Sequence, residues 1–167
     1  MFKATFLLLL LLIFYGSATL AQTGRNMERE KEIWAELETF APNSVADFKL
    51  ATEAMDAQNY EQAIDLFLKV NQRAPRFDAA LRRLGGCLLM TGKKDAGFAF
   101  MEKALAIRRS PENLFSLAHS LVYPGVGSEG TREQKSRALE LLKEANRSPQ
   151  PFNDPDSLVL QAQLAMD

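Results

Sequence analysis

Few side chains in this chain of 167 residues have the types and spacing that chemistry needs. His119 is the only histidine and Cys87 is the only cysteine. A zinc site combines several nitrogen or sulfur ligands at short spacings, and a general base needs a nucleophile and an orienting partner. No local motif around His119 or Cys87 supplies either set. We therefore predict that the protein is not an enzyme and has no catalytic residues, no metal and no cofactor.

The segment Gly85–Lys94 contains glycines and lysines, which are the residue types of a phosphate-binding loop. The spacing of such a loop would place a glycine where Cys87 stands and a serine or threonine where Lys94 stands. Both are missing, so we interpret Gly92 as a turn between two helices and predict no nucleotide site. Because a single thiol cannot form an internal disulfide, Cys87 is expected to be a small buried apolar residue.

Positive and negative charges nearly balance, with 20 Lys+Arg residues against 21 Asp+Glu residues and a net charge of −1. Nonspecific nucleic-acid binding depends on a surplus of positive charge. We therefore expect a protein or peptide partner and no nucleic acid. The arginine pairs Arg82-Arg83 and Arg108-Arg109 are typical of solvated helix faces and of helix C-termini, where cations suit the dipole.

Residues 1–21 have the layout of a secretory signal peptide. Lys3 precedes an apolar run over residues 6–15, and small residues lead to the motif Thr19-Leu20-Ala21. Cleavage after this motif would leave Gln22 as the N-terminus. We therefore predict a secreted or periplasmic protein that does not touch the membrane after cleavage. An uncleaved segment would instead act as a membrane anchor, because its length approaches that of a bilayer span.

Beyond the leader, apolar residues recur at intervals of three and four, which is typical of helices. Ser110-Pro111-Glu112 and Thr131-Arg132-Glu133-Gln134 have the residue order of helix N-termini. Ser44 is expected to cap another helix, and Pro42 and Pro75 to end the helices before them. No segment shows the sustained alternation of a strand, so the sequence predicts an all-α fold.

A pattern of small and apolar residues recurs after about 34 residues, a period that marks stacked repeats. It consists of Ala63-Ile64, Phe67 and Val70, then Gly97-Phe98, Met101 and Ala104, then Ala138-Leu139, Leu142 and Ala145. Small residues such as Ala51, Gly85 and Gly97 allow two helix axes to approach closely. We therefore expect stacked helix pairs, an architecture that usually binds other molecules along a concave surface.

At these residues the chain resembles the tetratricopeptide repeat (TPR) family. Residues 44–77 form the clearest unit, which carries Leu50-Ala51, Asn59-Tyr60, Ala63-Ile64, Phe67 and Pro75 at the spacing of the family. The next unit departs from this pattern at Lys94, where the first unit has Tyr60. The resemblance implies an all-α, right-handed superhelix of antiparallel helix pairs, with about three TPR units and flanking half-units.

The resemblance divides the chain into four parts. They are a signal peptide (1–21), a polar leader with an N-terminal packing helix (22–43), three helical repeats (44–151) and a C-terminal half-repeat or capping helix (152–167). The repeats cover residues 44–77, 78–110 and 111–151, the last with an inserted loop at 123–130. The glycines of this insertion predict a flexible loop, which serves either binding or spacing. Residues 28–40 resemble the lone second helix of a repeat.

The resemblance also implies that the outward positions of each first helix line a concave groove. These partner-binding positions are Phe48, Thr52, Met55, Arg82, Leu89, Phe115, His119 and Val122. Some TPR proteins grip the C-terminal carboxylate of a chaperone peptide with a Lys/Asn clamp, whose places are here taken by Phe48, Thr52 and Arg82. That specificity is therefore not expected, and the wall suits an apolar helix or an extended peptide. The alternative is that several of these residues simply pack against neighbouring helices.

These features favour an exported TPR scaffold that binds a protein or peptide partner in its groove, as an adaptor or assembly factor. The alternative class is an N-terminal module or accessory subunit of an exported enzyme, such as a peptidase or cell-wall hydrolase. A third possibility is a structural homo-oligomer. In the last helix, Leu158, Ala162 and Ala165 are expected to cover the third repeat. Leu160 and Leu164 would then form an uncovered interface for a second subunit, a partner or a continuation of the chain.

Overall fold

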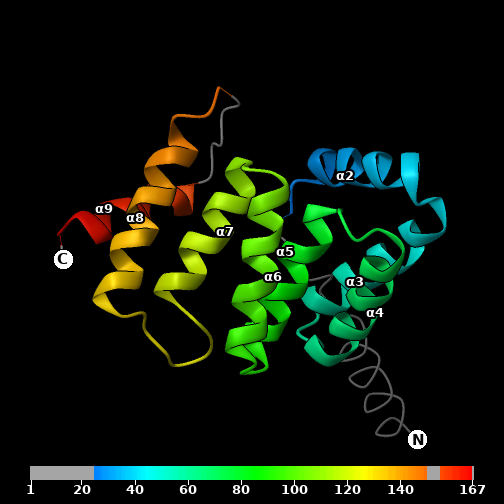
Figure 1. The fold of residues 1–167 in the computed structure, drawn as a ribbon, viewed down its shortest axis with the longest axis horizontal. Helices are drawn as coiled ribbons and strands as arrows, with labels where there is room; N and C mark the ends of the chain where they lie inside the picture. The colour runs from blue at the N-terminus through cyan, green and yellow to red at the C-terminus, as the bar shows by residue number, and fades with distance from the viewer. Residues whose placement is uncertain (1–24, 150–154, 167) are drawn as a thin grey trace, which may run out of the picture.

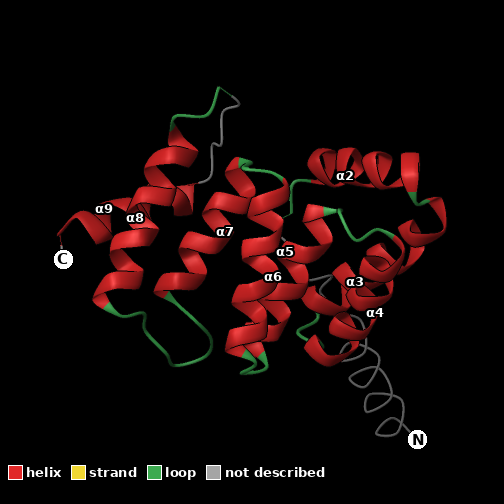
Figure 2. Cartoon of the chain, viewed as in Figure 1, coloured by secondary structure: helices red, strands yellow, loops and turns green. Residues whose placement is uncertain are grey.

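The computed structural model describes residues 25–149 and 155–166, and every regular element within these ranges is a helix (Figure 2). The elements are α2 (Met27–Phe40), the 3-10 helix η1 (Pro42–Ser44), α3 (Val45–Asp56), α4 (Tyr60–Arg73), α5 (Asp78–Met90), α6 (Lys94–Ile107), α7 (Pro111–Val122), α8 (Arg132–Asn146) and α9 (Pro155–Met166). The predicted all-α class is confirmed. The predicted signal peptide lies outside the described ranges, within which no helix is long and apolar enough to span a bilayer.

Local sequence signals set several of the helix ends. The Ser110 hydroxyl accepts a hydrogen bond from the Asn113 backbone at 3.3 Å, directly before the proline that begins α7. Thr131 and Gln134 form a complete capping box at the start of α8. Ser44 makes no side-chain cap, because its backbone is already helical where η1 runs into α3, with φ −99° and ψ −11°, whereas a capping residue has an extended backbone. Asn26, which the sequence interpretation missed, caps α2 through its side-chain oxygen.

Successive helices pack as pairs, α3 with α4, α5 with α6, and α7 with α8. The pairs follow one another from α3 and α4 near one end of the molecule to α8 and α9 at the other end (Figure 1). Further contacts join α4 to α5, α6 to α7 and α5 to α7. The first helices α3, α5 and α7 therefore belong to successive layers, and residues far apart in sequence can meet on their common face.

The α5–α6 seam, which we define by Gly85 and Gly97, has the closest helix contact that the sequence predicted. A Cβ atom on Gly85 would lie 2.6 Å from the Met101 Cγ atom and 2.7 Å from the Gly97 carbonyl oxygen. A Cβ atom on Gly97 would lie 2.8 Å from the Leu89 Cγ atom and 2.9 Å from the Gly85 carbonyl oxygen. Any side chain at either position would push the two backbones apart, so the predicted role of both glycines is confirmed.

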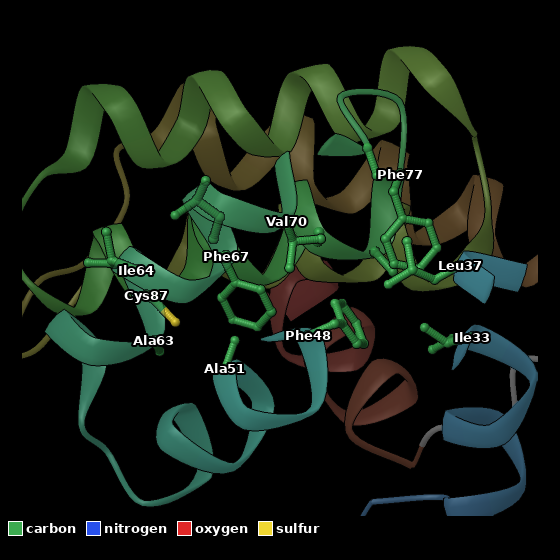
Figure 3. Close-up of a cluster of buried hydrophobic side chains, with 14 of the residues drawn as sticks. Ile33, Leu37, Phe48, Ala51, Ala63, Ile64, Phe67, Val70, Phe77 and Cys87 are labelled. Carbon is green, nitrogen blue, oxygen red and sulfur yellow. The ribbon is translucent and has the colours of Figure 1, made fainter. Parts of the chain in front are cut away.

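Aromatic rings from α3, α4 and the connection before α5 form the centre of the first core cluster. The Phe48 ring makes edge-on contacts with the rings of Phe67 and Phe77, at centroid distances of 5.7 and 5.3 Å. Figure 3 shows Ile33 and Leu37 of α2 beside these rings. Cys87 belongs to the same cluster and is fully buried, and burial raises the pKa of its thiol to about 12. Cys87 is therefore an inert apolar residue, as predicted.

The face of α9 that packs in the core is not the face that the sequence analysis expected. Leu160 and Leu164 are only 4% and 9% exposed and pack in the second core cluster with residues of α7 and α8. Leu158 is 61% exposed, and Ala162 and Ala165 also face solvent. The prediction that Leu160 and Leu164 form an uncovered interface is therefore wrong. The stripe with Leu158, Ala162 and Ala165 and the stripe with Leu160 and Leu164 both have helical spacing. The periodicity of the sequence therefore could not show which of the two is buried.

The inserted loop packs against the helices instead of projecting freely into solvent. The Gly130 amide donates a hydrogen bond to the Val122 carbonyl at 2.8 Å, and the Lys94 ammonium donates one to the Ser128 hydroxyl at 3.0 Å. Gly125 has a φ of +119° and approaches so closely that a Cβ atom would lie 2.9 Å from the Leu89 carbonyl oxygen. The expected flexible loop is thus docked on α5 and α6, and glycine is required where it docks.

Candidate functional site

Four of the eight predicted groove residues lie in the core, namely Phe48, Thr52, Leu89 and Val122. Helix α2 covers the first two, because Ile33 and Leu37 share the cluster of Phe48. Leu89 and Val122 belong to the second core cluster, where the Leu89 side chain lies against Gly97 of α6. These four side chains are therefore structural residues, and their prediction as partner contacts is corrected.

The other four predicted residues, Met55, Arg82, Phe115 and His119, line a single cavity of about 300 Å³. They come from α3, α5 and α7, so the first helices do present them on one common face. A second cavity of about 290 Å³ opens beside it toward α2. The two cavities share Arg25, Arg82, Arg83, Phe115 and Ser116, and we refer to them together as the central cavity.

Helix α2 forms one wall of the central cavity because it reaches well beyond the first helix pair. Its Glu30 pairs with Arg83 of α5, and its Arg29 pairs with Glu112 of α7 at 2.9 Å. Its Glu36 pairs with Arg108, the C-cap residue directly after α6. The N-terminal packing helix expected within residues 22–43 is thus present as α2, and its contacts extend to α5 and α7. We call the contacts of residues 25–40 with α3, α5 and α7 the α2 seam.

A chain of buried charges crosses the α2 seam. The Arg83 guanidinium pairs with Glu30 and donates a hydrogen bond to the Thr52 hydroxyl at 2.6 Å. The Glu30 carboxylate also lies 3.5 Å from Arg25, which in turn holds Asp56 at the end of α3. Arg83 and Glu30 are each 5% exposed. Burial, followed by the neighbouring charge of Arg82, lowers the pKa of Arg83 to about 10, so it is still cationic at neutral pH.

Arg82 lies beside Arg83 but has a different environment. Its side chain is half-buried and lines both parts of the central cavity. Within the described ranges it makes no ion pair or hydrogen bond, and its Nε atom is buried without a partner. Burial lowers the pKa of Arg82, while Glu112, Asp78 and Glu30 oppose this from longer range. Because an arginine side chain does not lose its proton in proteins, Arg82 brings a positive charge to the cavity, whose lining also includes Asp156 of α9.

Several other polar atoms in the cavity wall have no hydrogen-bond partner in the protein. In the part of the chain that the structure describes they are Arg29 Nε, Glu30 Oε2, Arg83 Nε and Glu112 Oε2. Buried polar atoms are nearly always hydrogen-bonded, to protein, to solvent or to a ligand. Their gathering around one cavity distinguishes it from an ordinary packing gap between helices.

The central cavity also has apolar side chains in its wall, beside the polar Ser116, Ser120 and Asp156. Met55, Met101 and Phe115 contribute thioether and aromatic surface, and the Phe115 ring lies 5.9 Å from the imidazole of the exposed His119. The cavity thus combines one wall that attracts charged groups with one that attracts apolar groups, which is typical of binding sites. No group of three His, Cys, Asp or Glu residues within the described ranges could hold a metal ion. The arrangement suits binding of a small segment with both polar and apolar groups.

The sequence interpretation missed Arg25, Arg29, Glu30, Arg83 and Glu112 as cavity residues. One local signal was available for Glu30, because it occupies the same helical stripe as Ile33 and Leu37. A carboxylate in an apolar stripe requires a buried partner. Nothing in the sequence identifies that partner as Arg83, which lies 53 residues away.

Comparison with known proteins adds no closer identification. The chain matches no protein-family model, and no curated protein sequence matches it significantly. The functional conclusion therefore depends on the residues and geometry of the central cavity.

Proposed function

We propose that the protein is an exported scaffold of the TPR type, which binds a protein or peptide partner as an adaptor or assembly factor. In this proposal the pairs α3/α4, α5/α6 and α7/α8 are three repeats of a right-handed superhelix. The repeated motif, the paired packing of these helices and the close contact at Gly85 and Gly97 support this assignment. The hydrophobic segment at residues 1–21 supports export to the periplasm or the cell exterior.

The observation that carries the proposal is that Met55, Arg82, Phe115 and His119 line one cavity on the common face of α3, α5 and α7. The resemblance to TPR proteins places partner contacts on this face. Because α2 covers Phe48 and Thr52, the accessible part of the face is short. The proposed partner therefore inserts a short segment, with an apolar side chain against Met55 and Phe115.

Selection of short synthetic peptides on the immobilised protein tests this function. Replacing Phe115 by alanine should weaken the selected peptides by about tenfold or more, because aromatic anchors dominate binding energy. Leu50→Ala is a matched control, since Leu50 is an exposed apolar residue of α3 that does not line the cavity. Equal binding by the wild type and by a folded Phe115→Ala variant would contradict the proposal.

Export is tested separately by intact-mass analysis of protein secreted from cells. We expect a product that begins at Gln22, because the segment before it has the layout of a cleaved signal. Recovery of only the full-length chain in the membrane fraction would contradict cleavage and favour the anchor.

A further inference from the structure

Helix α9 is apolar on two opposite faces. Its inner face packs through Leu160 and Leu164 in the second core cluster. Its outer face exposes five apolar residues, which we call the outer stripe: Leu158, Val159, Ala162, Ala165 and Met166. The three large members, Leu158, Val159 and Met166, are 61%, 56% and 81% exposed. Because a helix that is apolar all round is normally buried on every side, the outer stripe indicates an interface.

The position of α9 explains why the described chain leaves the outer stripe uncovered. Helix α9 lies beside α8 at one end of the row of helix pairs, so no further pair packs on its outer side (Figure 1). The terminal helices of stacked repeats usually present a polar outer face, which keeps the array soluble. The stretch from Ser157 to Met166 contains no charged residue, so α9 lacks such a face.

The lack of charge on the outer stripe favours a second copy of this chain as its partner. A helix that lies on a membrane surface carries Lys and Arg beside its apolar face, and α9 has neither. The carboxylate of α9, that of Asp156, lines the central cavity instead of the stripe. Contacts with a different protein are usually oriented by complementary charges, whereas homodimer interfaces are more apolar.

The spacing of the outer stripe is the same when it is followed in either direction from Ala162. Leu158 and Met166 lie four residues before and after Ala162, and Val159 and Ala165 lie three residues before and after it. In an antiparallel contact centred on Ala162, Leu158 of one copy would lie level with Met166 of the other, and Val159 with Ala165. Each stripe residue would thus meet an apolar residue, and the small Ala162 would let the two helix axes approach closely.

We propose that the outer stripe of α9 binds the outer stripe of a second copy, in an antiparallel two-fold contact centred on Ala162. Such a contact closes on itself and leaves no apolar edge exposed. It does not depend on the peptide-binding function proposed above. The stripe is smaller than the roughly 800 Å² per partner of a typical stable interface, so we expect a dissociation constant of about 10 μM.

Sedimentation of the purified mature protein, at concentrations from well below to well above this value, tests the dimer. The wild type should change from monomer to dimer. Leu158→Lys/Ala162→Lys should weaken association by about tenfold or more, because it places unpaired ammonium groups in the contact. Both residues are exposed, so the fold should remain intact, which circular dichroism checks. Leu50→Lys is the matched control, since Leu50 is an exposed leucine of α3, and it should dimerise like the wild type.

A single engineered cysteine tests the two-fold arrangement. The native Cys87 is buried, so a new thiol on α9 is the reactive one. In Ala162→Cys the two new thiols would face each other across the contact, and mild oxidation should join the copies through a disulfide. Gln163→Cys is the matched control, because Gln163 is exposed but lies beside the stripe. We expect its disulfide to form about tenfold more slowly, since thiols that point apart cannot be bridged.

Each other result would overturn the proposal. A protein that stays monomeric at every concentration has no such contact, and its binding to phosphatidylcholine vesicles would assign the outer stripe to a membrane surface. A dimer that Leu158→Lys/Ala162→Lys leaves unchanged would place the interface elsewhere. A dimer that the two lysines dissociate, but in which Ala162→Cys and Gln163→Cys form disulfides equally fast, would show that the stripe meets a different surface of the second copy.

Discussion

The α5–α6 seam and the α2 seam join helices by different physical means. At the α5–α6 seam, two glycines bring the helix backbones together, and the surrounding contacts are apolar. At the α2 seam, Ile33 and Leu37 reach the core, but the contacts with α5 and α7 are ion pairs. The first seam depends on shape and the second depends on charge.

This difference explains where a binding cavity can form. Close packing between α5 and α6 leaves no room for a ligand, and it contributes dispersion and hydrophobic free energy at every contact. A buried ion pair contributes little net stability, because the loss of hydration offsets most of the attraction. Each buried charge does, however, require one particular partner of opposite charge at a defined position. The α2 seam therefore specifies where α2 lies while leaving polar space beside it.

The largest expected effect comes from breaking the buried pair of the α2 seam. Arg83→Met would leave the Glu30 carboxylate buried with only Arg25, at 3.5 Å. We expect the free energy of unfolding, measured in urea, to fall by about 3–5 kcal/mol. The double variant Arg83→Met/Glu30→Leu should recover most of this loss, because it leaves no uncompensated charge.

Arg73→Met is the control for this prediction, since Arg73 forms an exposed pair with Asp47 at 2.6 Å. Its loss should change the free energy of unfolding by about 1 kcal/mol or less. A double variant as unstable as Arg83→Met alone would show that the Arg83 stem, and not its charge, supports α2.

The next largest effect is expected at the α5–α6 seam. In Gly85→Ala the new methyl group would lie 2.7 Å from the Gly97 carbonyl oxygen, so the two backbones must separate. We expect a loss of about 1–3 kcal/mol in urea unfolding. In Gly86→Ala, the matched control one residue later, the methyl group meets only the Met101 Cε atom at 3.8 Å. It should be neutral or stabilising, because alanine favours helices. Equal effects of the two substitutions would mean that this seam tolerates separation.

A smaller effect on the free energy of unfolding is expected when the pH is lowered, because Glu112 of the α2 seam then becomes protonated. Burial works to raise the pKa of Glu112, but hydrogen bonds from backbone and Ser110 and the charge of Arg29 hold it below its ordinary value. A lowered pKa contributes stability that is present above the unfolded pKa and is lost as pH falls through the folded pKa. Between about pH 5 and pH 3 the wild type should therefore lose more stability than Glu112→Gln. Parallel losses in urea titrations of both proteins would show that Glu112 does not contribute.

The smallest effect on stability is expected at Arg82. It allows Arg82 and its neighbour Arg83 to be compared within the α2 seam. Arg82→Gln removes a half-buried charge that has no ion-pair partner in the described chain. We expect the free energy of unfolding to change by about 0.5 kcal/mol or less. Thermal and urea unfolding of Arg82→Gln and Arg83→Met should thus differ clearly. A loss at Arg82 as large as that at Arg83 would indicate a structural role for both arginines.

The amino-acid sequence by itself determined the helices, several of their ends and the close approach at Gly85 and Gly97. These features are local or repeat along the chain, so periodicity, capping residues and small side chains reveal them. Of the eight groove residues that the resemblance implied, Met55, Arg82, Phe115 and His119 line one cavity, whereas Phe48, Thr52, Leu89 and Val122 are buried in the core.

Only the tertiary structure decided where α2 lies, which stripe of α9 is buried and that the inserted loop docks on α5 and α6. Each of these depends on partners distant in sequence, and local patterns favour the alternatives equally well. The neighbouring arginines of α5 show this most clearly. Arg83 meets Glu30 of α2 while Arg82 meets no carboxylate in the described chain, because side chains at adjacent helical positions point in different directions.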